Sequence, residues 1–343
     1  MRNNRIKITS KIFIGLVVLA SWACSGHDSD KDVYQRSRDN INKVKDDVKE
    51  IHINDVMIGG IARLYIVDNY LLIVDHKSAD KLIHIFNKDS FEYVSSIADV
   101  GQGPGEITVI GHIEEDKENH AFLVSDHGKQ KIFSYNLDSV LANPSYMPAE
   151  KVRMDKSEFP HVYSFINDSV SVGLFIKPIG TNDFAQSAGK WNMMTGEIQS
   201  LSKEHPSVEK KRVSFAVSEE KDLFVECYAY DDLMSIYHLN GELQHDVYGP
   251  KWSEKTADRT PFFRKVEFCG DYIFASYSGE SESADKYMPT KFIVFDTEGN
   301  YIKTIETECQ VADFCVDEKN NRLIMNLDDE IQFGYLDLED LLI

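Results

Sequence analysis

The stretch Leu71-Leu-Ile-Val-Asp75-His76, followed by Ile85-Phe86-Asn87, returns as Phe122-Leu-Val-Ser-Asp126-His127, followed by Ser134-Tyr135-Asn136. Asp126 lies 51 residues after Asp75. Each copy joins an apolar run, a polar turn and a segment that ends in an aromatic and a polar residue. A composite unit of about fifty residues that repeats is typical of a radially repeated β fold.

The chain from Gly59 onward divides into six such passes, each with an inner strand, a second strand, a third strand and a more polar outer strand. The second strands are expected to begin near Leu72, Leu123, Val170, Leu223, Ile273 and Leu323. The third strands are expected to end at Phe86-Asn87, Tyr135-Asn136, Trp191-Asn192, Tyr237-His238, Phe295-Asp296 and Tyr335-Leu336-Asp337. We therefore predict an all-β fold, a six-bladed β-propeller of four-stranded antiparallel blades over residues 51–343.

Other folds account for the pattern less well. A parallel α/β fold needs helical periodicity between strands, and no stretch of twelve or more residues after residue 50 shows it clearly. A β-sandwich would not return a composite pattern at about fifty residues. The sixth pass lacks an obvious outer strand, which either Ile51–Met57 or the C-terminal Leu338–Ile343 could supply, and we predict the N-terminal segment.

The start of the chain has the features of an export signal. Basic residues precede the apolar run Ile12–Ala20, which is short for a membrane span, and residues 1–23 are therefore expected to form a signal peptide. The end of this segment, Ala23-Cys24-Ser25, resembles a bacterial lipoprotein box, although Ser21 and Trp22 depart from the usual pattern. The resemblance implies that Cys24 is acylated, which would anchor the protein stably. The alternative is an ordinary secretory signal with an incidental cysteine.

The segment after Cys24 is polar and dense in charge, so residues 24–50 are expected to form a flexible tether, with a short helix possible over Lys43–Glu50. Its first part, Ser25–Asp32, is similar to the acidic export tract of surface-exposed lipoproteins in Bacteroides-type bacteria. An outer-membrane location follows from these resemblances, at the cell surface or on the periplasmic side.

Composition narrows the range of partners. The 343 residues include 57 acidic and 37 basic side chains, which gives a formal net charge of −20. Such a balance disfavours nucleic acid and a direct electrostatic attachment to anionic lipid, because both require basic patches. The membrane is expected to be contacted through the lipid anchor only.

The run Val100-Gly101-Gln102-Gly103-Pro104-Gly105-Glu106 is the most distinctive in the chain. Its glycines and proline predict a tight connection from the outer strand of the first blade to the inner strand of the second. No Lys-Ser/Thr pair follows it, which disfavours a phosphate-binding loop. Connections of this kind lie on the face where propellers usually bind ligands, so we predict Gln102 and Glu106 as ligand-binding residues.

This glycine-rich run after a first blade, behind a lipoprotein-type signal, resembles the six-bladed, TolB-like β-propeller lipoproteins of Bacteroides-type bacteria. The resemblance covers roughly residues 50–343, but only Gly101–Glu106 is specific. It implies the fold and an envelope location. It implies no reaction and no catalytic residue.

Trp252 lies in a polar loop between the fourth and fifth blades and is our third predicted ligand-binding residue, as an aromatic platform for a sugar. Trp191, at the end of a third strand, is expected to pack between blades. The polar insert over Ser276–Lys286 is expected to be a solvated loop.

No motif in the sequence indicates catalysis or metal binding. The repeated His76 and His127 are interpreted as a polar turn that recurs with its blade. Four cysteines remain after Cys24, namely Cys227, Cys269, Cys309 and Cys315. We expect buried small apolar residues, although Cys269 and Cys315 occupy matching places in adjacent blades and an exported protein permits a disulfide.

The predicted function is therefore a binding or scaffold module for a protein, peptide or glycan, without a cofactor. The alternative is a calcium-dependent, lactonase-like hydrolase with the metal in the central channel. That alternative requires inner-strand acids such as Glu267 and Asp313 to converge on one ion. A third possibility is a purely structural partner in an envelope complex.

Overall fold

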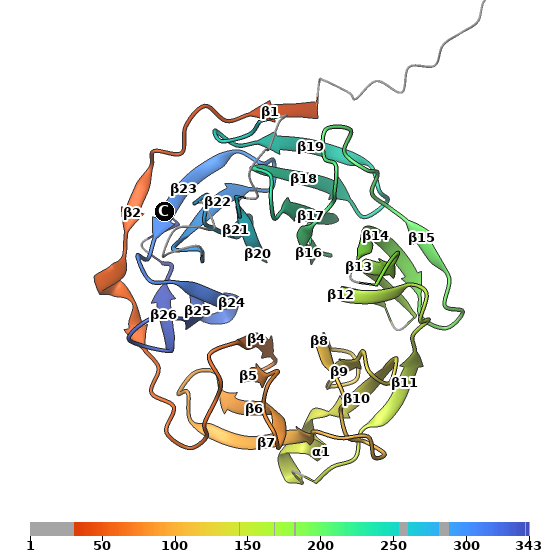
Figure 1. Cartoon of the computed structure of the whole chain (residues 1–343). Coiled ribbons are helices and arrows are strands. Elements are labelled where there is room, and N and C mark those ends of the chain that lie inside the picture. Colours follow the sequence, from red (N-terminus) through yellow and green to blue (C-terminus); the bar gives the residue numbers. More distant parts are fainter. Residues whose placement is uncertain are drawn as a thin grey trace, which may run out of the picture.

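The computed structural model describes residues 31–143, 145–167, 169–181, 183–253, 260–280, 288–339 and 341–342. These residues form six mainly antiparallel sheets arranged around a central axis, with β4, β8, β12, β16, β20 and β24 innermost (Figure 1). The predicted six-bladed β-propeller is confirmed. Cys24 and the predicted signal peptide lie outside the described residues.

The first three blades each consist of four consecutive strands. Blade 1 contains β4 (Ala62–Val67), β5 (Tyr70–Asp75), β6 (Lys81–Asn87) and β7 (Tyr93–Asp99). Blade 2 contains β8 (Ile110–Asp116), β9 (Ala121–Asp126), β10 (Lys131–Asn136) and β11 (Ala149–Arg153), with helix α1 (Leu137–Ala142) between the last two strands. Blade 3 contains β12 (Phe159–Asn167), β13 (Val170–Pro178), β14 (Phe184–Asn192) and β15 (Ile198–Ser200).

The other three blades add strands from the N-terminus. Blade 4 contains β16 (Val213–Ser218), β17 (Leu223–Tyr228), β18 (Leu233–His238) and β19 (Leu243–Tyr248). Blade 5 contains β20 (Phe263–Cys269), β21 (Tyr272–Tyr277), β22 (Lys291–Asp296) and β23 (Tyr301–Glu306). Blade 6 contains β24 (Val311–Asp317), β25 (Arg322–Leu327) and β26 (Phe333–Asp337), with a 3₁₀ turn η3 (Glu318–Asn320) between the first two.

The repeated sequence pattern corresponds to a repeated pairing in the core. Phe86 and Tyr135 lie opposite Leu71 and Phe122, the first core residues of their neighbouring second strands. The rings of Phe122 and Tyr135 stack at 5.3 Å, and those of Phe224 and Tyr237 stack at 4.9 Å in blade 4. In blades 2 and 4 the aromatic residue at the end of the third strand therefore stacks on an aromatic residue of the second strand, and both rings bury a large apolar area.

The repeated Asp-His pair is a structural turn, as interpreted from the sequence. Asp126 accepts backbone N–H bonds from Thr108 and Val109 at 2.9 and 3.0 Å, and Asp75 accepts one from Gly59 at 2.9 Å. Each carboxylate thus ties the turn after the second strand to the segment that leads into its own inner strand. The neighbouring histidines reach across to the next blade.

The ring is closed by the N-terminal segment, as predicted, but by different residues. β3 (Lys49–Glu50) pairs antiparallel with β26 and becomes the outer strand of blade 6. Ile51 adds one further hydrogen bond, from its N–H to Phe333 O at 2.9 Å. The expected strand over Ile51–Met57 is wrong, because the chain turns there toward the inner strand of blade 1 and leaves Met57 97% exposed.

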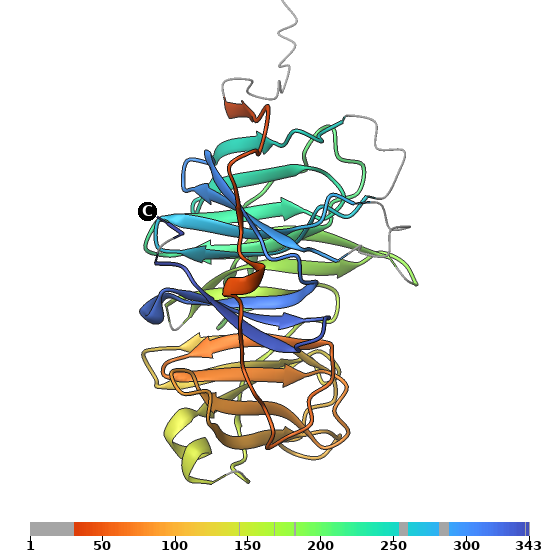
Figure 2. The ribbon, with the colours of Figure 1, turned by 90° about the vertical axis from the view of Figure 1, so that its left-hand side faces the viewer.

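The predicted tether differs from the structure from Lys31 onward. β1 (Asp32–Tyr34) pairs in parallel with β19, and β2 (Ile41–Lys43) pairs in parallel with β23. Together with the 3₁₀ turn η2 (Lys45–Asp47), which replaces the expected short helix, and β3, these strands form a strap over residues 31–50 that runs along the rim across blades 4, 5 and 6 (Figure 2). The strap is polar because it faces solvent, but its backbone covers sheet edges that would otherwise be unpaired.

Arg38 attaches the middle of the strap to the ring. Its Nη1 lies 2.8 Å from Asp232 Oδ1, and the two side chains are 7% and 0% exposed. The guanidinium also lies 5.2 Å from the ring centroid of Tyr277. Asp232 belongs to blade 4 and Tyr277 to blade 5, so one side chain joins the strap to two blades.

A second buried ionic group joins blade 6 to blade 1. Asp317 Oδ1 lies 2.7 Å from Lys88 Nζ, and both side chains are 1% exposed. Asp317 Oδ2 lies 3.1 Å from Arg322 Nη2, and Arg322 also donates to the Lys88 carbonyl. This group, the closing seam, fixes the last blade of the chain to the first.

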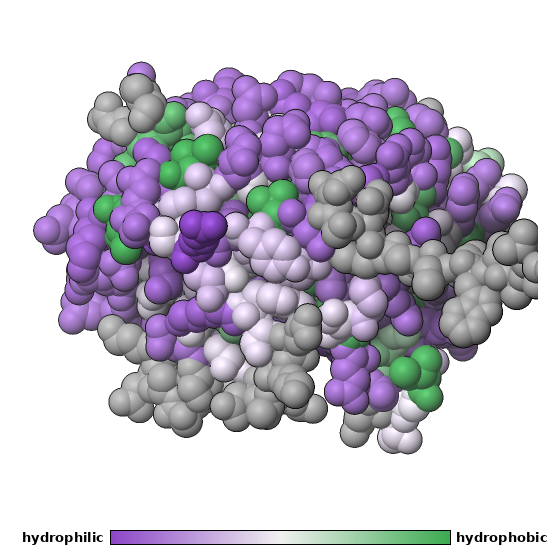
Figure 3. Space-filling model, turned by 90° about the horizontal axis from the view of Figure 1, so that it is seen from above, coloured by the Kyte–Doolittle hydropathy of each residue, from purple (hydrophilic) through white to green (hydrophobic). Residues whose placement is uncertain are grey.

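The rim visible in Figure 3 is mostly hydrophilic, and its apolar residues are scattered. Among the described helices, none is long and apolar enough to cross a membrane.

Candidate functional site

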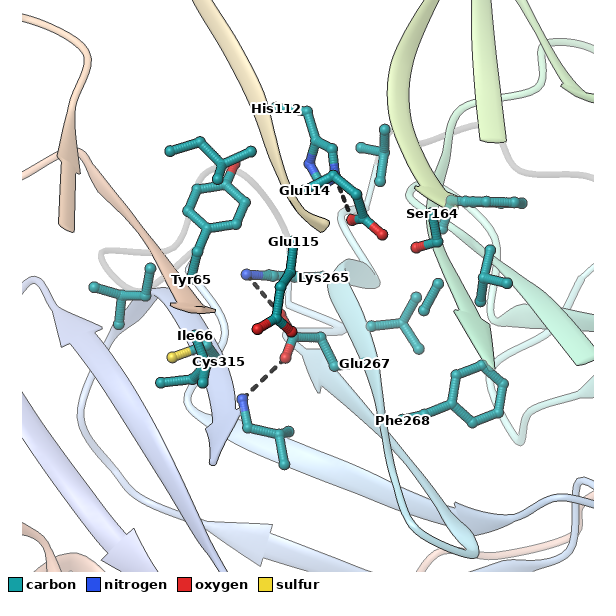
Figure 4. Close-up of a pocket in the computed structure, with 18 of the residues that line it drawn as sticks. Tyr65, Ile66, His112, Glu114, Glu115, Ser164, Lys265, Glu267, Phe268 and Cys315 are labelled. Carbon is teal, nitrogen blue, oxygen red and sulfur yellow. Dashed lines mark hydrogen bonds and ion pairs between the residues drawn. The ribbon is translucent and has the colours of Figure 1, made fainter. Parts of the chain in front are cut away.

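The candidate site is a central cavity of about 1030 Å³ that is lined by residues from all six inner strands (Figure 4). Its lining runs from Arg63 and Arg264, near the starts of β4 and β20, to the turns that follow the inner strands. A volume of this size is suited to a ligand at least as large as a typical drug molecule.

Carboxylates on the cavity wall join neighbouring blades. Asp313 of blade 6 accepts the Leu64 N–H of blade 1 at 2.7 Å. Glu114 of blade 2 accepts the Phe165 N–H of blade 3 at 3.1 Å, and Glu267 of blade 5 accepts the Val316 N–H of blade 6 at 2.9 Å. These acids satisfy backbone donors that the gaps between inner strands would leave unpaired. They hold the ring together and make the cavity wall polar at the same time.

Lys265 lies between two of these acids. Its Nζ is 2.9 Å from Glu267 Oε1 and 3.2 Å from Asp313 Oδ1, and it also donates to the Phe314 carbonyl. The three side chains are 25%, 26% and 11% exposed, to the cavity rather than to the outer surface. Burial opposes the charged form, but the two carboxylates outweigh it and hold the pKa of Lys265 above its ordinary value.

His112 and Glu114 form a second polar group on β8. His112 Nε2 lies 3.2 Å from Glu114 Oε2 and 3.0 Å from Tyr163 O. Both partners are acceptors, so we assign the ring proton to Nε2. The imidazole packs edge-to-face between the rings of Tyr65 and Tyr163, at 5.6 and 5.2 Å.

Glu115 also faces the cavity (Figure 4). It accepts the Asp68 N–H at 2.7 Å. Burial raises the pKa of Glu115 above its ordinary value. This carboxyl group therefore takes up a proton more readily than a solvated glutamate.

The end of the cavity at the turns after the inner strands is acidic. Glu118, Glu219, Glu220 and Glu318 all line it and are exposed. The opposite end carries Arg63, Arg264 and His161. The cavity is therefore polarised along the axis of the propeller.

The residues present do not fit a calcium ion. Calcium takes six to eight oxygen ligands. Both oxygens of Glu267 and both of Asp313 are already engaged by Lys265 or by backbone N–H groups. An ammonium group thus stands where these acids would hold a metal. Within the part of the chain that the structure describes, no group of three or more His, Cys, Asp or Glu side chains could hold a metal ion.

Replacement of Lys265 by methionine is expected to lower the free energy of unfolding by about 3 kcal/mol at pH 7.5, because two carboxylates lose their buried partner. Burial already raises the pKa of Glu267 in the native protein, and the loss of Lys265 should raise it further. A carboxyl group whose pKa is higher in the folded than in the unfolded state destabilises the folded protein as the pH rises. The stability lost in K265M should therefore be full at pH 7.5 and shrink toward pH 5. Urea denaturation at both pH values measures this.

K265R, which retains the charge, serves as the control and should lose less stability than K265M. Calcium should leave the Tm of the native protein unchanged. A rise would show that the ion binds the folded state, contrary to the assignment of Lys265 as the resident cation.

The structure does not bring the three predicted ligand-binding residues together. Glu106 folds back into its own loop, where its Oε2 accepts the Gly103 N–H at 2.6 Å. A Cβ on Gly101 would come within 2.0 Å of the same oxygen, so a larger residue there would displace the Glu106 carboxylate. Gln102 is exposed in this loop. Neither residue lines the central cavity.

Trp252 lies away from the channel. Its ring packs edge-to-face on Tyr248 at 5.0 Å and on His205 at 5.8 Å. It is half-buried against the core between blades 3 and 4 and does not line the cavity. A ligand-binding role for Trp252, Gln102 and Glu106 stays a prediction. Trp191 is 3% exposed and packs on Tyr163 and Phe175, as expected.

The four described cysteines, Cys227, Cys269, Cys309 and Cys315, are buried and are not joined to one another by disulfides. Burial raises the pKa of the Cys269 thiol to about 11, so it is unreactive at neutral pH.

Sequence reasoning missed most of the cavity lining. It named Glu267 and Asp313 as available acids but did not select Arg63, His112 or Lys265. The sequence signal that could have identified cavity residues is a pair of polar residues two positions apart in an inner strand, as in His112-Ile-Glu114 and Lys265-Val-Glu267. Residues two apart point to the same side of a strand, so such pairs mark the face turned to the channel.

Comparison with known proteins supports the architecture. Residues 53–163 match the DUF5128 family, which is described as a 6-bladed beta-propeller. The structure is similar to a luciferin-regenerating enzyme, with a TM-score of 0.53 at 12% identity over 84% of this chain and 94% of that one. It is similar to a Bacteroides fragilis protein described provisionally as exported, with a TM-score of 0.53 at 13% identity over 87% and 88% of the two chains.

A calcium-binding regucalcin from Agrobacterium tumefaciens gives a TM-score of 0.52 at 10% identity, over 86% of this chain and 94% of that one. No curated protein matches the sequence. At sequence identities this low, the similarity to these structures shows the fold alone.

Proposed function

We propose that the protein is a cell-envelope lipoprotein, acylated at Cys24, whose propeller binds a ligand in the central cavity. The partner is a small molecule, or the end of a peptide or glycan chain, that fits within about 1030 Å³. The observation that carries the proposal is the central cavity itself, because polar or apolar residues from every blade line its wall. A rigid ring that presents convergent side chains can bind without a reactive group.

Two features favour binding over the metal-dependent hydrolase. Lys265 occupies the place between Glu267 and Asp313 that a metal would require. A third wall acid, Glu114, is held by the Phe165 N–H and by His112. These groups are fixed in position, as a recognition surface requires.

Ser164→Trp tests the proposal. Ser164 lines the cavity from β12 and points into it (Figure 4), so an indole there should fill part of the space without breaking a core contact. The native protein, recovered from its own envelope, should carry a ligand that mass spectrometry detects. S164W should lose at least nine-tenths of it and retain the native Tm.

Ser145→Trp is the matched control, because Ser145 is exposed in the connection after α1 and should tolerate the same ring without effect. Equal ligand content in S164W and S145W would refute the central cavity as the binding site. Absence of any co-purified ligand from the native protein would count equally against the proposal.

A further inference from the structure

Two arginines at one end of the cavity form no ion pair with a described residue. Arg63 on β4 is half-buried, and Arg264 on β20 is exposed. Arg264 Nε donates to Ala312 O at 2.9 Å. Neither side chain forms an ion pair with any residue in the described ranges, whereas Lys265, next to Arg264, has two carboxylate partners. In a chain with a net charge of −20, unpaired arginines in a cavity are unexpected.

Histidines surround this end of the cavity. His161 lines the cavity from β12 and lies 6.3 Å from the ring of His127. Burial and the charge of Arg63 lower the pKa of His161 to about 3 and that of His76 to about 4, so both rings are neutral at pH 7. Burial and the charge of Arg63 also lower the pKa of His127. These neutral rings do not offset the positive charge of Arg63 and Arg264.

We infer that Arg63, Arg264 and His161 form an anion-binding subsite that takes the carboxylate group of an organic ligand. This inference rests on the proposed function, since the remainder of the ligand would occupy the central cavity. A guanidinium presents two parallel N–H donors whose spacing matches the two oxygens of a carboxylate. Wall acids such as Glu115 accept hydrogen bonds, so the remainder of the ligand should carry donors such as hydroxyl groups.

The charges at the two ends of the cavity also determine from which end an anionic ligand approaches. Four glutamates at the other end, Glu118, Glu219, Glu220 and Glu318, outnumber Lys117, the basic residue that lines the same end, and repel anions. The carboxylate should therefore enter from the face on which the outer-to-inner connections lie. A singly charged carboxylate is favoured over a phosphate dianion, because Asp313 and Glu267 lie on the same wall and already limit the positive potential.

Ligand-observed NMR on the full chain tests the subsite with four probes, namely acetate, inorganic phosphate, galacturonate and galactose. Galacturonate and galactose differ only at C6, which is a carboxylate in galacturonate and a hydroxymethyl group in galactose. We expect galacturonate to bind at least tenfold more tightly than galactose, and acetate to bind at millimolar concentration. The double variant R63Q/R264Q should reduce the preference for galacturonate to less than twofold.

The matched control is K77Q/K156Q. Lys77 and Lys156 are exposed in loops on the same face, so this variant removes two charges there without touching the cavity. Its preference should equal that of the native protein. Equal binding of galacturonate and galactose, binding of neither, a preference that survives R63Q/R264Q, or phosphate bound tenfold more tightly than acetate would each overturn the carboxylate subsite.

The envelope experiment separates this inference from the proposed function. If R63Q/R264Q retains the co-purified ligand that S164W loses, the cavity binds a ligand but the carboxylate subsite is wrong. If S164W retains the ligand, the proposed function itself fails.

Discussion

Asp317→Asn should lower the free energy of unfolding by about 4 kcal/mol, the largest effect that we expect from a single substitution. Among the described residues, Asp317 carries the only buried negative charge in the closing seam. The change removes this charge, while Lys88 and Arg322 remain. An asparagine has nearly the same shape and can still accept one hydrogen bond. The loss therefore measures two cations without their buried counter-ion and not a cavity.

The pH dependence of this effect has a defined sign. Burial alone would raise the pKa of Asp317, but hydrogen bonds from Lys88 and Asn320 and the charge of Arg322 hold it below its ordinary value. Such a carboxylate stabilises the fold fully above its unfolded pKa of about 3.9 and less as the pH falls through its folded pKa. The difference between D317N and the native protein should be constant from pH 6 to pH 8 and shrink below about pH 4.

Asp89→Asn is the matched control. Asp89 also contacts Lys88 Nζ, at 3.4 Å, but its side chain is 54% exposed. An exposed ion pair contributes less than about 1 kcal/mol, because water screens it. Urea denaturation of both variants measures the contrast. If D317N loses no more stability than D89N, the closing seam does not hold blade 6 to blade 1 in the way described.

Arg38→Met should lower the free energy of unfolding by about 3 kcal/mol and should loosen the strap selectively. Among the described residues, the variant leaves the buried Asp232 with neutral partners, the Tyr277 hydroxyl at 3.2 Å and the Lys251 N–H at 3.0 Å. It also removes a cation that lies over the Phe263, Tyr277 and Phe295 rings. Methionine keeps the apolar contact, so the loss should be mainly electrostatic.

Amide hydrogen exchange distinguishes a loosened strap from general destabilisation. Amides of β1 and β2 should exchange faster in R38M than in the native protein, by more than those of β5 or β9. Arg36→Met is the control, since Arg36 is exposed two residues away and forms no ion pair with a described residue. Equal acceleration in every strand would mean that Arg38 stabilises the ring as a whole and has no special role in the strap.

The blades could be predicted from the sequence because their signal is local and repeated. Phe86 and Tyr135 mark the same position in successive units, and Asp75 and Asp126 mark the same turn. The strap could not be predicted in the same way. β1 and β2 are three residues long, carry few apolar side chains and gain their hydrogen bonds from strands more than 200 residues away.

The cavity lining escaped prediction for a different reason. Whether Lys265 faces a channel or an outer surface depends on the position of five other strands, which no short stretch of sequence contains. The ligand residues proposed from sequence were chosen for unusual chemistry in loops. In the structure Glu106 bonds within its own loop and Trp252 packs on Tyr248, and their role in ligand binding stays a prediction.

The strap also constrains the order in which the molecule can be completed. Lys49 is synthesised 288 residues before Asp337, the residue whose carboxylate it contacts. Pairings over such distances form slowly, because loop-closure entropy must be overcome first. Until β26 has been made, β3 has no partner strand, and an incomplete ring exposes strand edges that can pair with another chain. A chain that lacks either β3 or β26 should therefore fail to complete blade 6.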